Sequence, residues 1–165
     1  MIRRIQEDSN KKSRAAAYFV LGKITKNTSD LSAVQFLINQ AYTETDRYIT
    51  SSIYDLLAEI PKPKGTEIST LKLAVHDKDW LIRHSAIRSL GGCLKTEAED
   101  ILISISDSSD DPFDIIYANA TLNRFGTTRA IPTLEKHLKS RKRDVKDSAR
   151  YAIDEIRRRE GNQPK

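Results

Sequence analysis

The chain has very little of several residue types and segments that would indicate particular protein classes. It contains one cysteine, Cys93, in 165 residues, which excludes an intramolecular disulfide framework and fits a reducing compartment. The longest apolar run, residues 15–21, is far shorter than the ~20 residues that cross a bilayer. Acidic and polar residues follow the basic start of the chain where a targeting segment would be apolar. We therefore expect a cytoplasmic protein with no membrane contact.

Sequence patterns of catalytic, cofactor and metal sites are also missing. The chain has no Gly-rich phosphate loop and no Gly-x-Ser-x-Gly nucleophile elbow. His76 and His84 are separated by a turn, which is not a metal-ligand spacing. Residues 107–111 lack the Gly and the terminal Glu of a calcium loop. We therefore expect no enzyme activity, no cofactor and no metal.

Charge, in contrast, is plentiful and unevenly distributed. Charged residues make up 31% of the chain, and the formal net charge is +5. Residues 94–128 carry two basic and seven acidic side chains, whereas residues 129–165 carry twelve basic and six acidic ones. The basic segment could neutralise phosphates, but the acidic segment would repel a nucleic acid that followed the whole chain. The alternative is a solvated terminal cap, which repeat arrays need.

The chain also repeats itself, with a short phrase recurring at intervals of 28 to 36 residues. In each copy, a small or aliphatic residue lies four positions before the start of the phrase. In four of the five copies, an aliphatic or aromatic residue lies four positions further back, and steps of four place these residues on one helical stripe. Two-helix units of this kind cannot bury their apolar stripes alone, so neighbouring units must supply the core. The equivalent positions are Gly22, Ala58, Gly91, Gly126 and Asp154.

A second amphipathic segment precedes each of the later copies. Asp30 has the chemistry of an N-cap before residues 31–38, and Asp111-Pro112 has that of an N-cap followed by the first helical position. Pro132 is compatible with a helix over residues 128–138 only in the first turn. Residues 101–105 could form a strand or a helix, and we favour a helix. The pattern predicts about ten helices in five antiparallel pairs.

The phrases resemble HEAT repeats. Residues 79–91 (DWLIRHSAIRSLG) match the second helix of that repeat, with an Asp-rich turn, an aliphatic-Arg pair, Ala and then Leu-Gly. Residues 131–138 followed by Val145 to Ala149 resemble a whole repeat, with Lys146 where Arg is usual. The spacing is similar to the short bacterial repeats of the phycobilin-lyase type. The resemblance implies an all-α solenoid, with residues 1–160 as one domain and residues 161–165 as a short disordered tail.

In HEAT-like solenoids the second helices line a concave binding face. We therefore expect a partner to contact the positions on those helices that avoid the apolar stripe. Tyr and Arg dominate binding hot spots, although the Arg after the aliphatic residue often has a structural role in a pair with a turn Asp. The predicted partner-binding residues are Arg14, Tyr18, Tyr54, Arg83, Ile87, Arg88, Asn123, Lys146 and Arg150.

Three functions remain open from the sequence. The first is a non-catalytic module that binds another protein, either as an adaptor or as an immunity-type protein that neutralises a toxin. The second is nucleic-acid binding by the basic C-terminal repeat through Arg141, Lys142 and Arg143, with an affinity that falls steeply with salt. The third, implied only by the repeat subgroup, is a lyase-like or chaperone-like helper of a client protein. The oligomeric state and the identity of the partner do not follow from the sequence.

Overall fold

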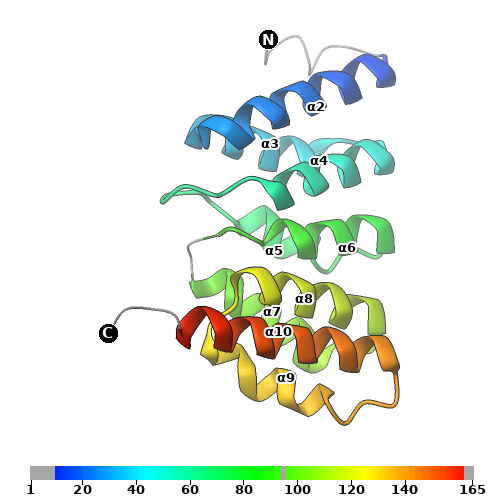
Figure 1. The fold of residues 1–165 in the computed structure, drawn as a ribbon. Helices are drawn as coiled ribbons and strands as arrows, with labels where there is room; N and C mark the ends of the chain where they lie inside the picture. The colour runs from blue at the N-terminus through cyan, green and yellow to red at the C-terminus, as the bar shows by residue number, and fades with distance from the viewer. Residues whose placement is uncertain (1–9, 94–95, 162–165) are drawn as a thin grey trace. The chain divides into compact units, whose positions relative to one another are not determined.

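The computed structural model describes residues 10–93 and 96–161, and its regular elements are all helical (Figure 1). The described residues form no β-strand, only an isolated bridge between Lys62 and Cys93. No helix in this part of the chain is long and apolar enough to cross a membrane. The helices are α2 (Lys11–Thr28), α3 (Leu31–Thr43), α4 (Arg47–Glu59), α5 (Ser69–Ala74), α6 (Trp80–Ser89), α7 (Thr96–Ser108), α8 (Pro112–Phe125), the 3₁₀ turn η1 (Thr128–Ala130), α9 (Ile131–His137) and α10 (Arg143–Gly161).

Short polar side chains fix where most of these helices begin. The Asp30 carboxylate accepts a hydrogen bond from the Ala33 N–H at 2.8 Å, so the predicted cap of α3 is confirmed. Asp46 and Asp79 cap α4 and α6 in the same way. Each cap satisfies backbone N–H groups that have no partner inside the helix.

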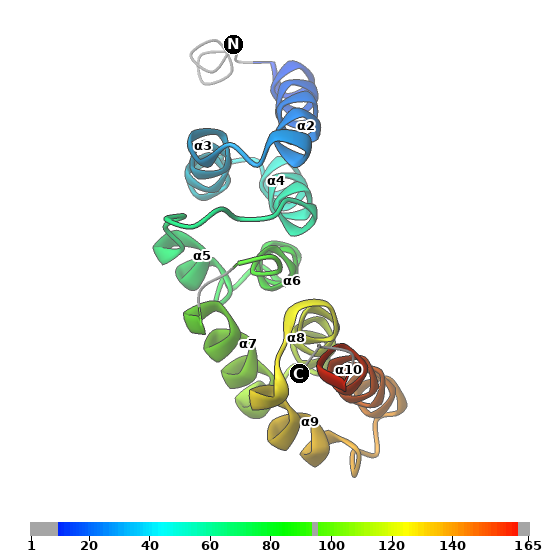
Figure 2. The same ribbon diagram turned by 60° about the vertical axis from the view of Figure 1, so that its left-hand side comes forward.

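The chain divides into two compact units, an N-terminal unit of residues 1–94 and a C-terminal unit of residues 95–165. In the N-terminal unit, α2, α4 and α6 lie side by side in one layer, and α3 and α5 form a second layer packed against it (Figure 2). The core between these two layers is formed by fully buried aliphatic side chains, which include Val34, Leu37, Ile53, Leu71 and Ile87. The apolar stripes are thus buried between helices of neighbouring pairs.

The N-terminal unit also contains a buried cation, Lys62, whose side chain is 2% exposed. Its ammonium donates hydrogen bonds to the carbonyl oxygens of Leu57 and Gly91, the latter at 2.5 Å. Leu57 lies in the last turn of α4, and Gly91 follows α6. Lysine near helix C-termini satisfies carbonyl groups that lack a partner and interacts favourably with the helix dipole. Lys62 therefore connects the ends of two neighbouring helices.

In the C-terminal unit, α8 packs against both α7 and α10, and α9 packs against α10 (Figure 2). Its core contains Leu102, Leu122, Leu134, Ile153 and Ile156. Residues 101–105 are helical within α7, and Pro132 lies in the first turn of α9, as the sequence predicted.

The fold class predicted from the sequence is confirmed: the protein is all-α, with helices packed in pairs as in a repeat solenoid. The assignment of residues 1–160 to one domain stays a prediction, and the expected tail at residues 161–165 lies almost wholly outside the described residues. In two of the helix pairs, the first helix is shorter than expected. α5 has six residues and α9 seven, and neither has a side-chain N-cap.

Candidate functional site

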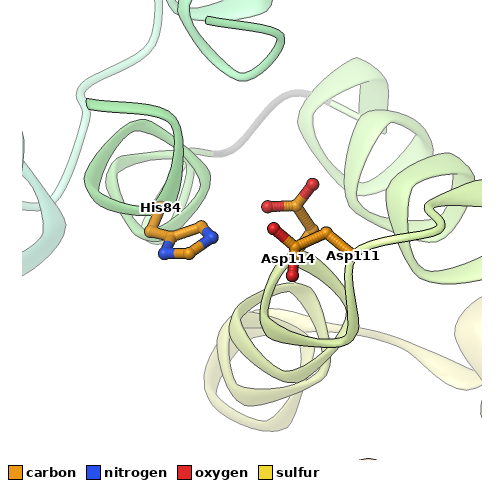
Figure 3. A group of neighbouring side chains, drawn as sticks. All are labelled: His84, Asp111 and Asp114. Atoms are coloured by element: carbon orange, nitrogen blue, oxygen red, sulfur yellow. The ribbon is translucent and has the colours of Figure 1, made fainter. Parts of the chain in front are cut away.

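A pocketed surface of the C-terminal unit lies on α8 and α10, the second helices of that unit. The start of α8 is fixed by Asp111, whose carboxylate accepts a hydrogen bond from the Phe113 N–H at 2.9 Å. Figure 3 shows the Asp111 side chain at this end of the helix. Pro112 occupies the first helical turn, where its missing N–H costs nothing. Asp114, also shown in Figure 3, is 7% exposed and accepts a hydrogen bond from Ser109 at 2.9 Å. These contacts set the register of α8.

The end of α8 is constrained by Gly126 and by Arg159 of α10. The Gly126 N–H donates to the Leu122 carbonyl at 2.7 Å, and a Cβ at Gly126 would lie 2.6 Å from the same oxygen. The Arg159 guanidinium donates to the carbonyl oxygens of Asn123 and Gly126, the latter at 2.8 Å. Arg159 thereby covers carbonyl groups at the helix C-terminus and ties α10 to α8.

Two asparagines of α8 provide further links to α10. The Asn119 amide donates to the Ser148 hydroxyl at 3.1 Å and accepts from the Ser106 hydroxyl at 2.7 Å. One turn later, the Asn123 amide donates to the Tyr151 carbonyl at 2.8 Å. Buried polar groups that have hydrogen-bond partners specify one arrangement of the helices around them. The surface that α8 and α10 form around these hydrogen bonds is therefore held in one arrangement before any partner binds.

An open pocket of about 620 Å³ lies on that surface. Ala120, Asn123 and Arg124 of α8 line one side, and Ser148, Tyr151, Asp154, Glu155 and Arg158 of α10 line the other. Tyr151 is 66% exposed. On α10 the last four of these residues recur at steps of three or four, so they share one face of the helix. The pocket thus combines an exposed aromatic ring with charges of both signs.

The charges in the pocket are oriented by one another. Glu155 accepts two hydrogen bonds from Arg158, at 2.7 and 2.9 Å. The hydrogen bond from Arg158 lowers the pKa of Glu155, and the same contact raises the pKa of Arg158. Both groups are therefore ionised at neutral pH. Arg124 lies over the ring of Phe125, 5.1 Å from its centroid, so its guanidinium is also held in place.

The structure places three of the predicted partner-binding residues in the core. Tyr18, Tyr54 and Ile87 are 3%, 1% and 0% exposed. The Tyr18 hydroxyl donates to the Gln40 side chain at 3.0 Å, and burial raises the pKa of both tyrosine hydroxyls. These side chains pack between helices instead of facing a partner, because the second helices of the N-terminal unit bury two adjacent faces.

The three predicted arginines of the N-terminal unit all have intramolecular acceptors. Arg14 forms a two-pronged ion pair with Glu44, at 3.0 and 3.1 Å, and the two side chains are 14% and 5% exposed. Arg83 donates to the Asp77 carbonyl at 2.9 Å. Arg88 pairs with Asp55 at 3.1 Å but remains 42% exposed. Arg14 and Arg83 thus make contacts that stabilise the fold. Of the three arginines, only Arg88 is exposed enough to contact a partner.

The predicted residues of the C-terminal unit all reach the surface. Asn123 lines the pocket, Lys146 is half-buried, and Arg150 is exposed and pairs with Asp147 at 3.1 Å. The basic residues Arg141, Lys142 and Arg143 are all exposed. Other basic side chains pair with the acidic segment: Arg129 with Glu99 and Asp100, and Lys136 with Asp107.

Sequence reasoning did not include Tyr151 and Arg158 in the predicted binding set, although both line the pocket. The signal that indicates them is the period of α10, whose buried residues are Val145, Ala149, Ala152, Ile153 and Ile156. Tyr151, Asp154 and Arg158 do not share the face of these buried residues and lie on the opposite face of the helix. An aromatic residue on a face that otherwise carries charge is a candidate contact residue.

A comparison with protein families finds that the model for HEAT repeats matches residues 68–154. No curated protein matches the chain. Among solved structures, the chain is similar to a crystal structure of an engineered protein from the Northeast Structural Genomics Consortium, with a TM-score of 0.45 and 15% sequence identity, over 95% of this chain and 98% of that one.

Proposed function

Because the chain belongs to the HEAT-repeat family, we propose that it is a non-catalytic module that binds another protein through the α8–α10 pocket. The observation that carries the proposal is the exposed Tyr151 ring beside the oriented Arg158–Glu155 pair. Tyrosine and arginine dominate binding hot spots because they combine contact area with directed hydrogen bonds. The links between α8 and α10 reduce the entropy that binding costs. An adaptor and an immunity-type protein both fit this proposal.

The test compares two exposed tyrosines in the full-length protein. Tyr151 lines the pocket, whereas Tyr48 is 68% exposed at the start of α4 in the N-terminal unit. We expect the unchanged protein to retain a stoichiometric partner from native lysates, and Tyr151→Ala to weaken that complex by about 2 kcal/mol or more. Tyr48→Ala is the matched control and should retain the partner. Equal retention by both variants contradicts the assignment of the pocket.

Nucleic-acid binding is the second candidate function, and the exposure of residues 141–143 favours it. The Arg143 side chain is 91% exposed, even though it lies 3.5 Å from Asp147. The pairing of Arg129 and Lys136 with acidic side chains leaves residues 141–143 as the main basic stretch for phosphates. This function predicts a shift of labelled RNA or duplex DNA at low salt. The shift should disappear when Arg141, Lys142 and Arg143 are replaced by Gln.

A further inference from the structure

The outward side of α2 in the N-terminal unit is unusually apolar for a surface helix. Phe19, Val20 and Ile24 are 55%, 44% and 50% exposed. With Ala16, these residues follow helical steps of three and four, so they form one continuous strip. We call these four residues the α2 strip. Scattered apolar residues on a surface need no explanation, whereas a contiguous group indicates a binding surface.

The opposite side of α2 is also apolar, and it is already used. Tyr18, Leu21, Gly22 and Thr25 are buried, and α2 packs there against α3 and α4. A Cβ at Gly22 would lie 2.9 Å from the Leu56 side chain of α4, which shows how closely the two helices approach. A helix that borders solvent has one apolar and one polar face. α2 has a second apolar face, which none of the described helices covers.

The charges of α2 are all of one sign. The helix contains five basic residues and no acidic one. Lys11, Arg14 and Lys26 pair with Asp46, Glu44 and Glu59 of the neighbouring segments. Lys12 and Lys23 are exposed on the same side as the α2 strip, and the Lys23 ammonium lies 5.2 Å from the centroid of the Phe19 ring. The strip is therefore bordered by cations that make no ion pair within the described chain.

We propose that the α2 strip is a docking site for an acidic amphipathic helix of a partner protein. Apolar residues of that helix at steps of three and four pack on Phe19, Val20 and Ile24, as the apolar face of an amphipathic helix does on the apolar surface of its partner. Its Glu or Asp residues meet Lys12 and Lys23, because opposite charges steer and select partners across an interface. A second copy of this chain fits the strip less well, since α2 would then bring lysines against lysines without any carboxylate. This surface is independent of the α8–α10 pocket.

The test uses a synthetic, fluorescently labelled helical peptide with Leu at steps of three and four and Glu at the flanking positions. We expect it to bind the full-length protein, and a matched peptide with Lys in place of Glu to bind at least about tenfold more weakly. The variants Lys12→Glu/Lys23→Glu and Val20→Asp/Ile24→Asp should each lose at least about tenfold in affinity for the Glu peptide. Lys64→Glu/Lys78→Glu is the control, because it makes the same charge change at exposed lysines outside α2 and should bind normally.

Three results would overturn the proposal. The first is equal affinity of the Glu peptide for the α2 variants and the control, with folding of each variant verified by thermal unfolding. The second is a homodimer of the unchanged protein that becomes monomeric in Val20→Asp, because a second copy then occupies the strip. The third is binding of the peptide only after residues 1–9 are removed, because those residues then occupy it. Tyr151→Ala should not change peptide affinity, so this result and the test of the pocket can be separated.

Discussion

Arg14 and Arg88 show how the same residue type serves different purposes at different positions of the repeat. The Arg14 guanidinium is held between two oxygens of Glu44, and both side chains are largely shielded from water. The Arg88–Asp55 pair has a similar distance, but both of its side chains are more than two-fifths exposed. Exposed ion pairs contribute little because water screens them, whereas a shielded charge that loses its partner is strongly unfavourable.

We therefore expect Arg14→Met to lower the free energy of unfolding several times more than breaking an exposed pair would, because Glu44 keeps its burial and loses its main partner. Arg88→Met is the matched control, with an expected loss of about 0.5 kcal/mol or less. Urea unfolding of the full-length variants measures both. Equal losses would show that shielding from water does not separate the two pairs.

The same pair predicts how stability depends on pH. Burial raises the pKa of Glu44, but hydrogen bonds from Arg14 and from the backbone N–H groups of Asp46 and Thr45 outweigh it and lower the pKa below its ordinary value of 4.5. A carboxyl whose pKa is lowered in the folded state stabilises that state above the unfolded pKa. The contribution is lost as the pH falls through the folded pKa.

We therefore expect Glu44 to stabilise the protein fully at pH 6–7, and this contribution to fall progressively below about pH 4.5. Glu44→Gln keeps the shape of the side chain but cannot ionise. Its free energy of unfolding should be lower than that of the unchanged protein at pH 7 and should approach it at pH 3. A constant difference across this range would contradict the role of the carboxylate.

At the scale of the elements, local sequence signals were sufficient for much of the fold. Asp30 and Asp111 begin helices as predicted, because an N-cap needs only one side chain and the next turn of backbone. The pairing of helices followed from the repeat. The ends of α5 and α9 were less predictable, because short helices depend on packing more than on intrinsic propensity.

The candidate site was predictable only in part, because exposure on a helix depends on how many neighbours that helix has. Tyr54 and Ile87 avoid the main apolar stripe of their helices, yet both are buried. Tyr54 lies on α4, which packs against α2, α3 and α6, and Ile87 lies on α6, which packs against α4 and α5. Asn123 and Tyr151, in contrast, line the open pocket on α8 and α10. A sequence period shows which residues share a face, but not which faces a neighbouring helix covers.

At the scale of the whole molecule, the described chain divides into two compact units. In repeat proteins, stability is approximately the sum of terms for each repeat and for its nearest neighbours. Substitutions in the core of one unit should therefore act mainly on that unit. Ile87 and Leu122, both fully buried, provide one probe in each unit.

We expect Ile87→Ala to accelerate amide hydrogen exchange more in residues 10–93 than in residues 96–161, and Leu122→Ala to do the reverse. Each substitution should cost about 2–5 kcal/mol locally. Exchange of the full-length protein, measured by peptide mass spectrometry, reports both units in one experiment. Uniform acceleration by either variant would show one fully cooperative domain, as the assignment of residues 1–160 to a single domain implies.

The buried ammonium of Lys62 has a practical consequence for covalent labelling. Acylating reagents attack uncharged, accessible amines, and the Lys62 nitrogen is enclosed between two carbonyl oxygens in a side chain that is 2% exposed. Surface lysines such as Lys12 and Lys23 have no such shield. The rate at which Lys62 is acylated therefore reports how often the ends of α4 and α6 open.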